Sequence, residues 1–325
     1  MGTVLGAFLT RAGQKIELIT RNAEHVKALK EHGAHITGTV DFTVPVTAYT
    51  PEEMTGKYDL IFLMTKQREN AKICEFLNDY VSENGSVCTM QNGLPEPSVA
   101  SVIGTQRTFG CAIAWGAAYE SAGVVRLTSD PDKLTFAIGS LSGEPEGMYK
   151  AAEILKKVGK VEISDNFLGA RWAKLAINSA FSSISAVTGL TFGDISRLKA
   201  TRGLALDLLN EAFDTAEACG VTLEDIQGHD LVTLYRYKNG LKKKIALRLL
   251  PFAMKKHKDI VSGMYFDLKA GRQCDIDSVN GVVAHAARNF DVDVPLNHKV
   301  LEIAHKIERG ELEISPANAE LIKAD

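Results

Sequence analysis

The sequence predicts an α/β domain with a doubly wound parallel sheet, followed by an all-helical domain. In the first half, short runs rich in β-branched and aromatic residues alternate with helical stretches, the order that a parallel sheet requires. From residue 165 onward the patterns are long and helical, and strand signals almost vanish. A length of 325 residues suffices for two domains. We therefore expect a nucleotide-binding domain over residues 1–164 and a helical domain over residues 165–325, with no low-complexity linker between them.

The expected elements follow from hydrophobic periodicity and from capping residues. Asn22, for example, is a favourable N-cap for a helix that stops at Gly33. In the first domain we predict helix 2–13, strand 15–20, helix 22–33, strand 58–64, helix 68–81, strand 86–90, a hairpin of 123–128 with 133–139, helix 149–158 and strand 161–163. In the second domain we predict helices 166–187, 201–219, 232–250, 279–289 and 298–309.

The start of the chain departs from the usual order of a nucleotide-binding sheet. Such a sheet opens with a strand and a glycine-rich turn before its first helix, whereas here the first helix begins at Gly2. The pattern G-x-G-x-x-G can be completed only by residues before Met1, with Gly2 as its third glycine. We expect the first strand and the start of that loop to be missing, and keep the alternative that the domain simply begins with this helix.

Composition excludes several classes of protein. Lys and Arg number 37 against 40 Asp and Glu, and a net charge of −3 argues against an electrostatic nucleic-acid binder. No apolar run approaches the roughly 20 residues that span a bilayer, and no secretory signal precedes the first helix. The five cysteines form no C-x-x-C pair, which favours reduced thiols in the cytoplasm, and the eight histidines show no metal-ligand spacing.

Two cations indicate the cofactor. Arg21 directly follows strand 15–20, at the point where a dinucleotide-binding domain meets the adenosine ribose. A basic residue there accommodates the 2′-phosphate of NADP, whereas an acidic one favours NAD. Lys66 follows strand 58–64 and adds a second positive charge. The alternative is that both residues are ordinary solvated surface cations.

One helix carries the strongest catalytic pattern. Lys174, Asn178 and Ser182 are four residues apart, so an α-helix places them on one face. Between residues 172 and 189, Lys174 is the only charged residue. An isolated lysine is costly to bury without a partner, and a lysine with a tuned pKa is a candidate general acid. The other interpretation is a lysine with a buried stem whose amine reaches solvent at a domain edge.

Two further segments carry candidate polar groups. Asn92 lies in Gln91-Asn92-Gly93 after strand 86–90, at the carboxyl end of the strand, where ligands bind in open α/β sheets. Taken alone, Asn-Gly is most often just a turn. Asp275 belongs to a group of three aspartates before helix 279–289, of which N-capping explains one. Asp275 is therefore a candidate partner charge for Lys174.

Taken together, these motifs resemble the ketopantoate reductase family (2-dehydropantoate 2-reductase) over essentially the whole chain. The resemblance rests on helix 2–13, Arg21, Thr65-Lys66, Gln91-Asn92-Gly93-Leu94, Trp172-Ala173-Lys174 with Asn178, residues 267–281 and Pro295-Leu296-Asn297. It implies a Rossmann domain, a helical domain and an active site in the cleft between them. It also implies a cytoplasmic enzyme that reduces ketopantoate to pantoate with NADPH, on the route to pantothenate and coenzyme A. We expect a small keto acid as partner and no nucleic acid or membrane, and leave a homodimer open.

The resemblance also assigns roles to individual residues. Lys174 resembles the catalytic lysine that gives a proton to the carbonyl oxygen as hydride arrives from the nicotinamide. Asn92 matches an asparagine on the nicotinamide side, and Asn178 matches one that holds the hydroxyl region of the substrate. Arg21 and Lys66 match the pair that holds the NADP 2′-phosphate.

Three positions depart from the family pattern, and all of them fall on substrate contacts. Asp275 stands where glutamate is common, Ser182 where a second asparagine is common, and Gly263 where a serine holds the substrate carboxylate. Ser262 is the candidate to replace that serine. We therefore expect an NADPH-dependent 2-keto acid reductase, with ketopantoate as the first choice of substrate. The alternatives are an NAD-dependent β-hydroxyacid dehydrogenase and a catalytically silent NADP(H)-binding module.

Overall fold

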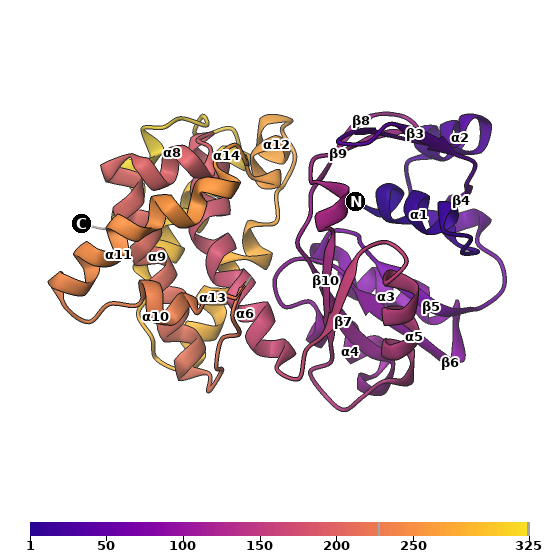
Figure 1. The fold of residues 1–325 in the computed structure, drawn as a ribbon, viewed down its shortest axis with the longest axis horizontal. Helices are drawn as coiled ribbons and strands as arrows, with labels where there is room; N and C mark the ends of the chain where they lie inside the picture. Colours follow the sequence, from indigo (N-terminus) through magenta and orange to yellow (C-terminus); the bar gives the residue numbers. More distant parts are fainter. Residues whose placement is uncertain (227, 324–325) are drawn as a thin grey trace. The chain divides into compact units, whose positions relative to one another are not determined.

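A computed structural model describes residues 1–226 and 228–323. They form two compact units, each with its own hydrophobic core. The first consists of Met1–Gln91 and Pro95–Phe167, and the second of Asn92–Leu94 and the residues from 168 onward. The first unit mixes strands and helices and the second is helical, as the sequence predicts (Figure 1).

The main sheet of the first unit has five strands in the order β11-β10-β7-β6-β5. They are β5 (Tyr58–Leu63), β6 (Val81–Thr89), β7 (Thr108–Ile113), β10 (Thr135–Gly139) and β11 (Lys160–Ile163). The pairs β5–β6 and β6–β7 are parallel, as predicted. Strand β10 runs antiparallel to β7, so this sheet is mixed rather than wholly parallel.

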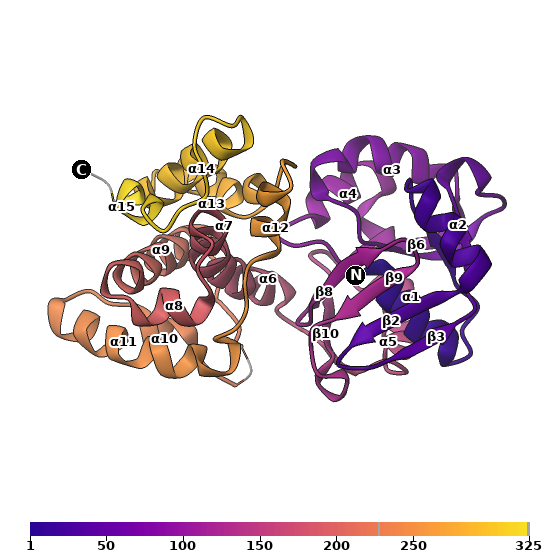
Figure 2. The ribbon, with the colours of Figure 1, turned by 90° about the horizontal axis from the view of Figure 1, so that it is seen from above.

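A second sheet has the order β3-β2-β9-β8 (Figure 2). Its strands are β2 (Ala34–Gly38), β3 (Phe42–Val44), β8 (Ala117–Ser121) and β9 (Val124–Leu127). Our predicted hairpin was wrong, because the antiparallel hairpin partner of β9 is β8, while β10 joins the main sheet. Four of the five β8 residues are exposed, so β8 lacks the apolar alternation that reveals a strand in a sequence. Two short strands, β1 (Glu17–Ile19) and β4 (Thr47–Tyr49), pair in parallel.

The helices of the first unit are α1 (Gly2–Arg11), α2 (Ala23–His32), α3 (Asn70–Asn78), α4 (Glu96–Ile103) and α5 (Glu146–Leu155), with short 3₁₀ turns at Pro51–Glu53, Gln67–Glu69, Thr105–Arg107 and Pro131–Lys133. Helix α1 packs against β1 and β2. An added Cβ on Gly6 would lie 2.0 Å from Leu18 Cδ2, so glycine permits this close approach of helix and strand. Asn22 caps α2 as predicted, accepting the His25 N–H at 3.0 Å.

The His25 side chain joins three elements of the first unit. Its Nε2 lies 3.0 Å from Thr3 Oγ1 on α1, and its Nδ1 accepts the N–H of Gly123, in the turn between β8 and β9, at 3.0 Å. Because Nδ1 accepts, the proton of the neutral ring is on Nε2. Burial lowers the pKa of His25, which keeps the ring neutral.

The helices of the second unit surround one core. They are α6 (Phe167–Ile177), α7 (Ser183–Thr188), α8 (Phe192–Arg197), α9 (Lys199–Ala218), α10 (Leu231–Tyr235), α11 (Gly240–Ala253), α12 (Gly263–Lys269), α13 (Asn280–Asn289), α14 (Pro295–Glu308) and α15 (Asn318–Ile322), with a π-turn at Asn178–Ser182 and 3₁₀ turns at Met254–His257 and Ile276–Ser278 (Figure 1). One face of α9 is buried in this core and carries Leu204, Leu208, Ala212 and Ala216.

The predicted helix 232–250 was wrong as a single element, because α10 and α11 are separate. Asn210 of α9 separates them: its Nδ2 donates to Tyr235 O at 3.1 Å, and its Oδ1 accepts the Tyr237 N–H at 3.1 Å. The side chain of Asn239 then caps α11. These hydrogen bonds come from a distant helix, and apolar periodicity does not reveal them.

Candidate functional site

The helix that carries Lys174 has a single accessible face. From residue 171 to residue 188, every residue is buried except Lys174, Ile177, Asn178 and Ser182, which are partly exposed. Three of these four are the polar residues whose spacing the sequence analysis singled out. The neighbours Trp172 and Leu175 belong to the apolar core of the second unit.

The helix is not a regular α-helix across this face. Asn178–Ser182 forms a π-turn, in which the Ser183 N–H donates to Asn178 O, five residues back. Within this turn the Ser182 hydroxyl donates to Asn178 Oδ1 at 3.1 Å. Sequence reasoning missed the π-turn because no glycine or proline marks it. Such turns occur frequently at functional sites.

Ser262 lies against the same helical run, one turn further along. Its N–H donates to Ser185 Oγ at 3.0 Å, and its hydroxyl accepts the Met264 N–H at 3.2 Å, which caps α12. Ser262 is only 4% exposed. Capping therefore explains why a serine stands here, and substrate binding by Ser262 stays a prediction.

The segment that contains Asp275 is also tied to the π-turn. Asp275 is partly exposed at the start of the 3₁₀ turn, and Asn280, five residues on, donates from Nδ2 to Ser179 O at 3.0 Å. The structure thus brings Asn280 to the helical run that carries Lys174. A partner-charge role for Asp275 stays a prediction. The neighbouring Cys274 is a free thiol, and burial raises its pKa to about 12, so it stays protonated at neutral pH.

Asn92 groups with the helical unit rather than with the sheet that precedes it. Residues Asn92–Leu94 belong to the second unit, and Leu94 packs against that unit's core. Asn92 itself is exposed, and Gly93 has a φ of +74°, which glycine adopts without strain. The side chain of Asn92 is therefore carried by the same unit as Lys174.

Sequence reasoning passed over Gln91, the residue before Asn92. Gln91 is buried and donates from Nε2 to Thr65 O at 2.9 Å and to Asn70 Oδ1 at 2.7 Å, while its Oε1 accepts from Thr89 Oγ1 at 2.9 Å. These bonds link the loops that follow β5 and β6, the loops that carry Lys66 and Asn92. A polar residue directly after a buried strand was the available signal.

The predicted cofactor residues lie in the first unit. Arg21 is highly exposed, and its guanidinium donates to Glu69 Oε2 at 2.7 Å. Lys66 is also exposed and directly precedes the Gln67–Glu69 turn. Gly2 begins α1, and a Cβ added there would meet only Met64 Sδ, at 3.9 Å. The close helix–strand approach that a Rossmann glycine allows occurs at Gly6 rather than at Gly2.

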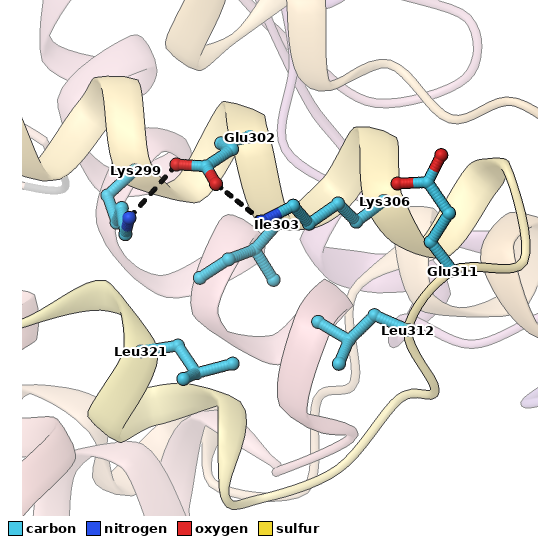
Figure 3. Close-up of a pocket in the computed structure, with 7 residues that line it drawn as sticks. All are labelled: Lys299, Glu302, Ile303, Lys306, Glu311, Leu312 and Leu321. Atoms are coloured by element: carbon cyan, nitrogen blue, oxygen red, sulfur yellow. Dashed lines mark hydrogen bonds and ion pairs between the residues drawn. The ribbon is translucent and has the colours of Figure 1, made fainter.

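The part of the chain that the structure describes also has a cavity of about 270 Å³ beside α14 and α15 (Figure 3). Three of its charged side chains pair with one another, because Glu302 binds Lys299 at 3.0 Å and Lys306 at 2.6 Å. None of the predicted site residues lines it. Over residues 1–226 and 228–323 we find no cluster of potential metal ligands, and no described helix is long and apolar enough to cross a membrane.

Comparison with known proteins decides the family. The model of the family described as "Ketopantoate reductase PanE/ApbA" matches residues 1–142, and the model of its C-terminal domain matches residues 166–308. The chain belongs to the ketopantoate reductase family. The resemblance drawn from the sequence motifs is thereby confirmed, and with it the assignment as an oxidoreductase.

Relatives match over nearly the whole chain. The 2-dehydropantoate 2-reductase of Lactococcus lactis subsp. lactis is 25% identical over 315 residues, 95% of either chain. That of Pyrococcus horikoshii is 25% identical over 300 residues, 91% of either chain. Among solved structures, D-mandelate dehydrogenase with NADH and anilino(oxo)acetate has a TM-score of 0.82 at 19% identity, over 95% of this chain and 96% of that one. A ketopantoate reductase of Ralstonia eutropha has a TM-score of 0.78 at 24% identity, over 94% and 95% of the chains. These structural likenesses confirm the fold.

Proposed function

We propose that this chain reduces a 2-keto acid to a 2-hydroxy acid with NADPH, and that 2-dehydropantoate is the substrate, in pantothenate and coenzyme A biosynthesis. The observation that carries the proposal is the accessible face formed by Lys174, Asn178 and Ser182 on an otherwise buried helix. Membership of the ketopantoate reductase family, and relatives named 2-dehydropantoate 2-reductases, support the choice of substrate. A cytoplasmic location and a homodimer stay predictions, which cell fractionation and sedimentation of the purified chain test.

The first unit offers donors that suit a dinucleotide phosphate. Arg21 and Lys66 are exposed cations, and the first turn of α1 at Gly2 has backbone N–H groups without intrahelical acceptors. A guanidinium is well matched to a phosphate, so Arg21 would hold the 2′-phosphate in exchange for Glu69. When bound, the reduced nicotinamide supplies the hydride.

The second unit supplies the groups that act on the keto acid. The Lys174 ammonium donates a hydrogen bond to the keto oxygen and gives up its proton as negative charge develops there. Asp275, from the segment tied to the π-turn, is the proposed partner charge of the Lys174 ammonium. The Asn178 amide and the Ser182 hydroxyl hold the hydroxyl region of the substrate, and Ser262 and Asn92 complete the proposed contacts.

Steady-state kinetics of the purified chain test this proposal, with NADPH oxidation followed by absorbance in the presence of 2-dehydropantoate. We expect Lys174→Ala to lower kcat by about 100-fold or more, because it removes a general acid, and to leave NADPH affinity unchanged. Lys299→Ala, which alters an exposed lysine on α14, is the matched control and should retain full activity. An unchanged kcat in Lys174→Ala would remove Lys174 from its role. NADPH binding without turnover of any keto acid would favour the silent module.

One observation favours a second candidate, an NADH-dependent reductase of another 2-keto acid. The carboxylate of Glu69 lies 2.7 Å from the Arg21 guanidinium and competes with a 2′-phosphate for it. D-mandelate dehydrogenase, which shares the fold, binds NADH together with anilino(oxo)acetate. Comparing kcat/KM for NADPH and NADH, with 2-dehydropantoate and phenylglyoxylate as substrates, separates the two candidates.

A further inference from the structure

The π-turn leaves a backbone carbonyl without its α-helical donor. In a regular α-helix the Ser183 N–H would donate to Ser179 O, but here it donates to Asn178 O and Ala180 O. Ser179 is fully buried, so its carbonyl cannot turn to water. It accepts instead from the Ser183 hydroxyl and from Asn280 Nδ2, the latter at 3.0 Å. A side chain from α13 thus satisfies the backbone at the π-turn.

Asn280 is itself held in a buried chain of hydrogen bonds. Its Nδ2 also donates to Asn297 Oδ1 at 2.9 Å, and Asn297 Nδ2 donates to Glu211 Oε2 at 2.7 Å. Both asparagines are 0% exposed. With one amide proton on Ser179 O and the other on Asn297 Oδ1, the Asn280 side chain has a single orientation.

Glu211 fixes the far end of this chain. Its carboxylate accepts the backbone N–H groups of Leu296 at 2.9 Å and Asn297 at 3.0 Å, in the first turn of α14. Such groups have no intrahelical acceptor, and the positive end of the helix dipole favours an anion there. Helices α9, α13 and α14 are therefore joined at one point, and Asn280 transmits their position to the π-turn.

We propose that Asn280 is a positioning residue, which holds the π-turn through Ser179 O and thereby sets the direction of the Ser182 side chain on the accessible face relative to Lys174 and Asn178. The inference rests on the proposed function, because it assigns Asn178 and Ser182 to the substrate. Without the Asn280 donor, the turn relaxes toward regular α-helical bonding, since that is how Ser179 O regains a backbone donor. An α-helical turn holds fewer residues than a π-turn, so the relaxation turns Ser182 about the helix axis relative to Lys174 and Asn178. Lys174, which precedes the turn, stays in place.

Two asparagines of the second unit allow a matched comparison. Asn318 Nδ2 donates to Val187 O at 2.9 Å and to Glu313 O at 2.9 Å, so this buried amide also satisfies a carbonyl of α7, beyond the π-turn. Asn280→Ala and Asn318→Ala each remove one buried amide with two acceptors. Asn280→Asp keeps the size of the side chain but removes its amide N–H donors. This variant replaces Asn280→Ala in the experiment if Asn280→Ala does not fold.

Hydrogen exchange of the peptide 178–184 and steady-state kinetics with 2-dehydropantoate are the two measurements. For the Asn280 variants we expect faster exchange in this peptide and a KM for 2-dehydropantoate raised by about tenfold, the effect of losing one or two hydrogen bonds, with the KM for NADPH unchanged. For Asn318→Ala we expect a similar loss of thermal stability, with wild-type exchange in this peptide and a wild-type KM.

Either of two results overturns the inference. Wild-type exchange over residues 178–184 in both Asn280 variants would show that Asn280 does not hold the π-turn. An equal rise of KM in Asn318→Ala would show that Asn280 acts only through general stability. A wild-type chain that turns over no 2-dehydropantoate contradicts the proposed function instead, and the exchange measurement still tests whether Asn280 holds the turn.

Discussion

The ion pair of Arg21 with Glu69 sets up a measurable prediction about cofactor preference. The guanidinium and the carboxylate are 2.7 Å apart, and their side chains are 74% and 36% exposed. At such exposure an ion pair contributes at most about 1 kcal/mol. A 2′-phosphate that binds Arg21 therefore has to displace an interaction of at most that strength.

The magnitudes follow from this geometry. Glu69→Gln removes the competing charge, so we expect the KM for NADPH to fall by up to about fivefold, the factor that corresponds to about 1 kcal/mol. Arg21→Ala removes a charge-assisted hydrogen bond of about 1.5–3 kcal/mol to the phosphate, so we expect kcat/KM for NADPH to fall by about 10- to 100-fold. Because NADH lacks the 2′-phosphate, its kcat/KM should change by less than about twofold in Arg21→Ala.

The assay is the ratio of kcat/KM for NADPH to that for NADH, measured at low salt because the interactions are screened by ions. The first unit offers a matched control in Arg126 and Glu120, another surface ion pair, at 2.5 Å. Glu120→Gln should leave the ratio unchanged. If Arg21→Ala also leaves it unchanged, Arg21 does not touch the 2′-phosphate, and the argument from its position after β1 is refuted.

Three further predictions concern stability and the substrate side of the site. His25→Ala should lower the free energy of unfolding by about 2–3 kcal/mol, because the Gly123 N–H loses its acceptor, whereas His32→Ala on the exposed face of α2 should not. Since burial lowers the pKa of His25, the stability that its neutral ring contributes is present above pH 6.5 and is lost as the pH falls. Urea unfolding at several pH values measures this loss, and an equal acid sensitivity of His25→Ala and wild type would contradict it. Burial lowers the pKa of His305, but hydrogen bonds and charge from Glu308 and Asp277 raise the pKa overall. The protonated ring therefore stabilises the fold at low pH, and this stabilisation is lost as the pH rises through the raised pKa. His305→Gln should flatten this decline in the free energy of unfolding. Gly263→Ser should leave the melting temperature within a few degrees, because a Cβ there meets nothing within 4 Å, and should raise kcat/KM if the substrate carboxylate lies there.

Local signals in the sequence were enough for much of the fold. Asn22 and Gly33 bound α2 because capping depends on residues within one turn. The accessible face that carries Lys174 could be predicted because Lys174 is the only charged residue between residues 172 and 189, as expected of a helix that is otherwise buried. The predictions that were wrong concern features that depend on contacts between residues far apart in the sequence. The pairing of β9 with β8 depends on an exposed strand without alternation, and the break before α11 depends on Asn210, more than twenty residues away in sequence.

The site shows the same division between local and distant causes. Arg21 and Asn92 are candidates because they follow strands, and strand ends are visible in hydrophobic runs; their roles stay predictions. The π-turn and its donor Asn280 could not be predicted, since 101 residues separate Asn280 from Ser179. Gln91 lies between these cases: its position was visible, but its role in joining two loops appears only from its hydrogen bonds.

The departures from the family motif acquire a physical meaning from these contacts. Ser182 donates its proton to Asn178 Oδ1, so under the proposed function this pair would present the substrate with the Asn178 amide donor and the lone pairs of Ser182. At Gly263 there is open space where the family pattern implies a serine hydroxyl. A substrate bound in the proposed way would meet fewer hydrogen-bond donors and more room than the motif implies. A site holds a substrate hydroxyl selectively only when its own buried polar groups are left unpaired without it. Ser182 already satisfies Asn178 Oδ1, so a keto acid that lacks the hydroxyl of 2-dehydropantoate would lose little binding free energy here. We therefore expect kcat/KM to differ only weakly between 2-dehydropantoate and such a keto acid.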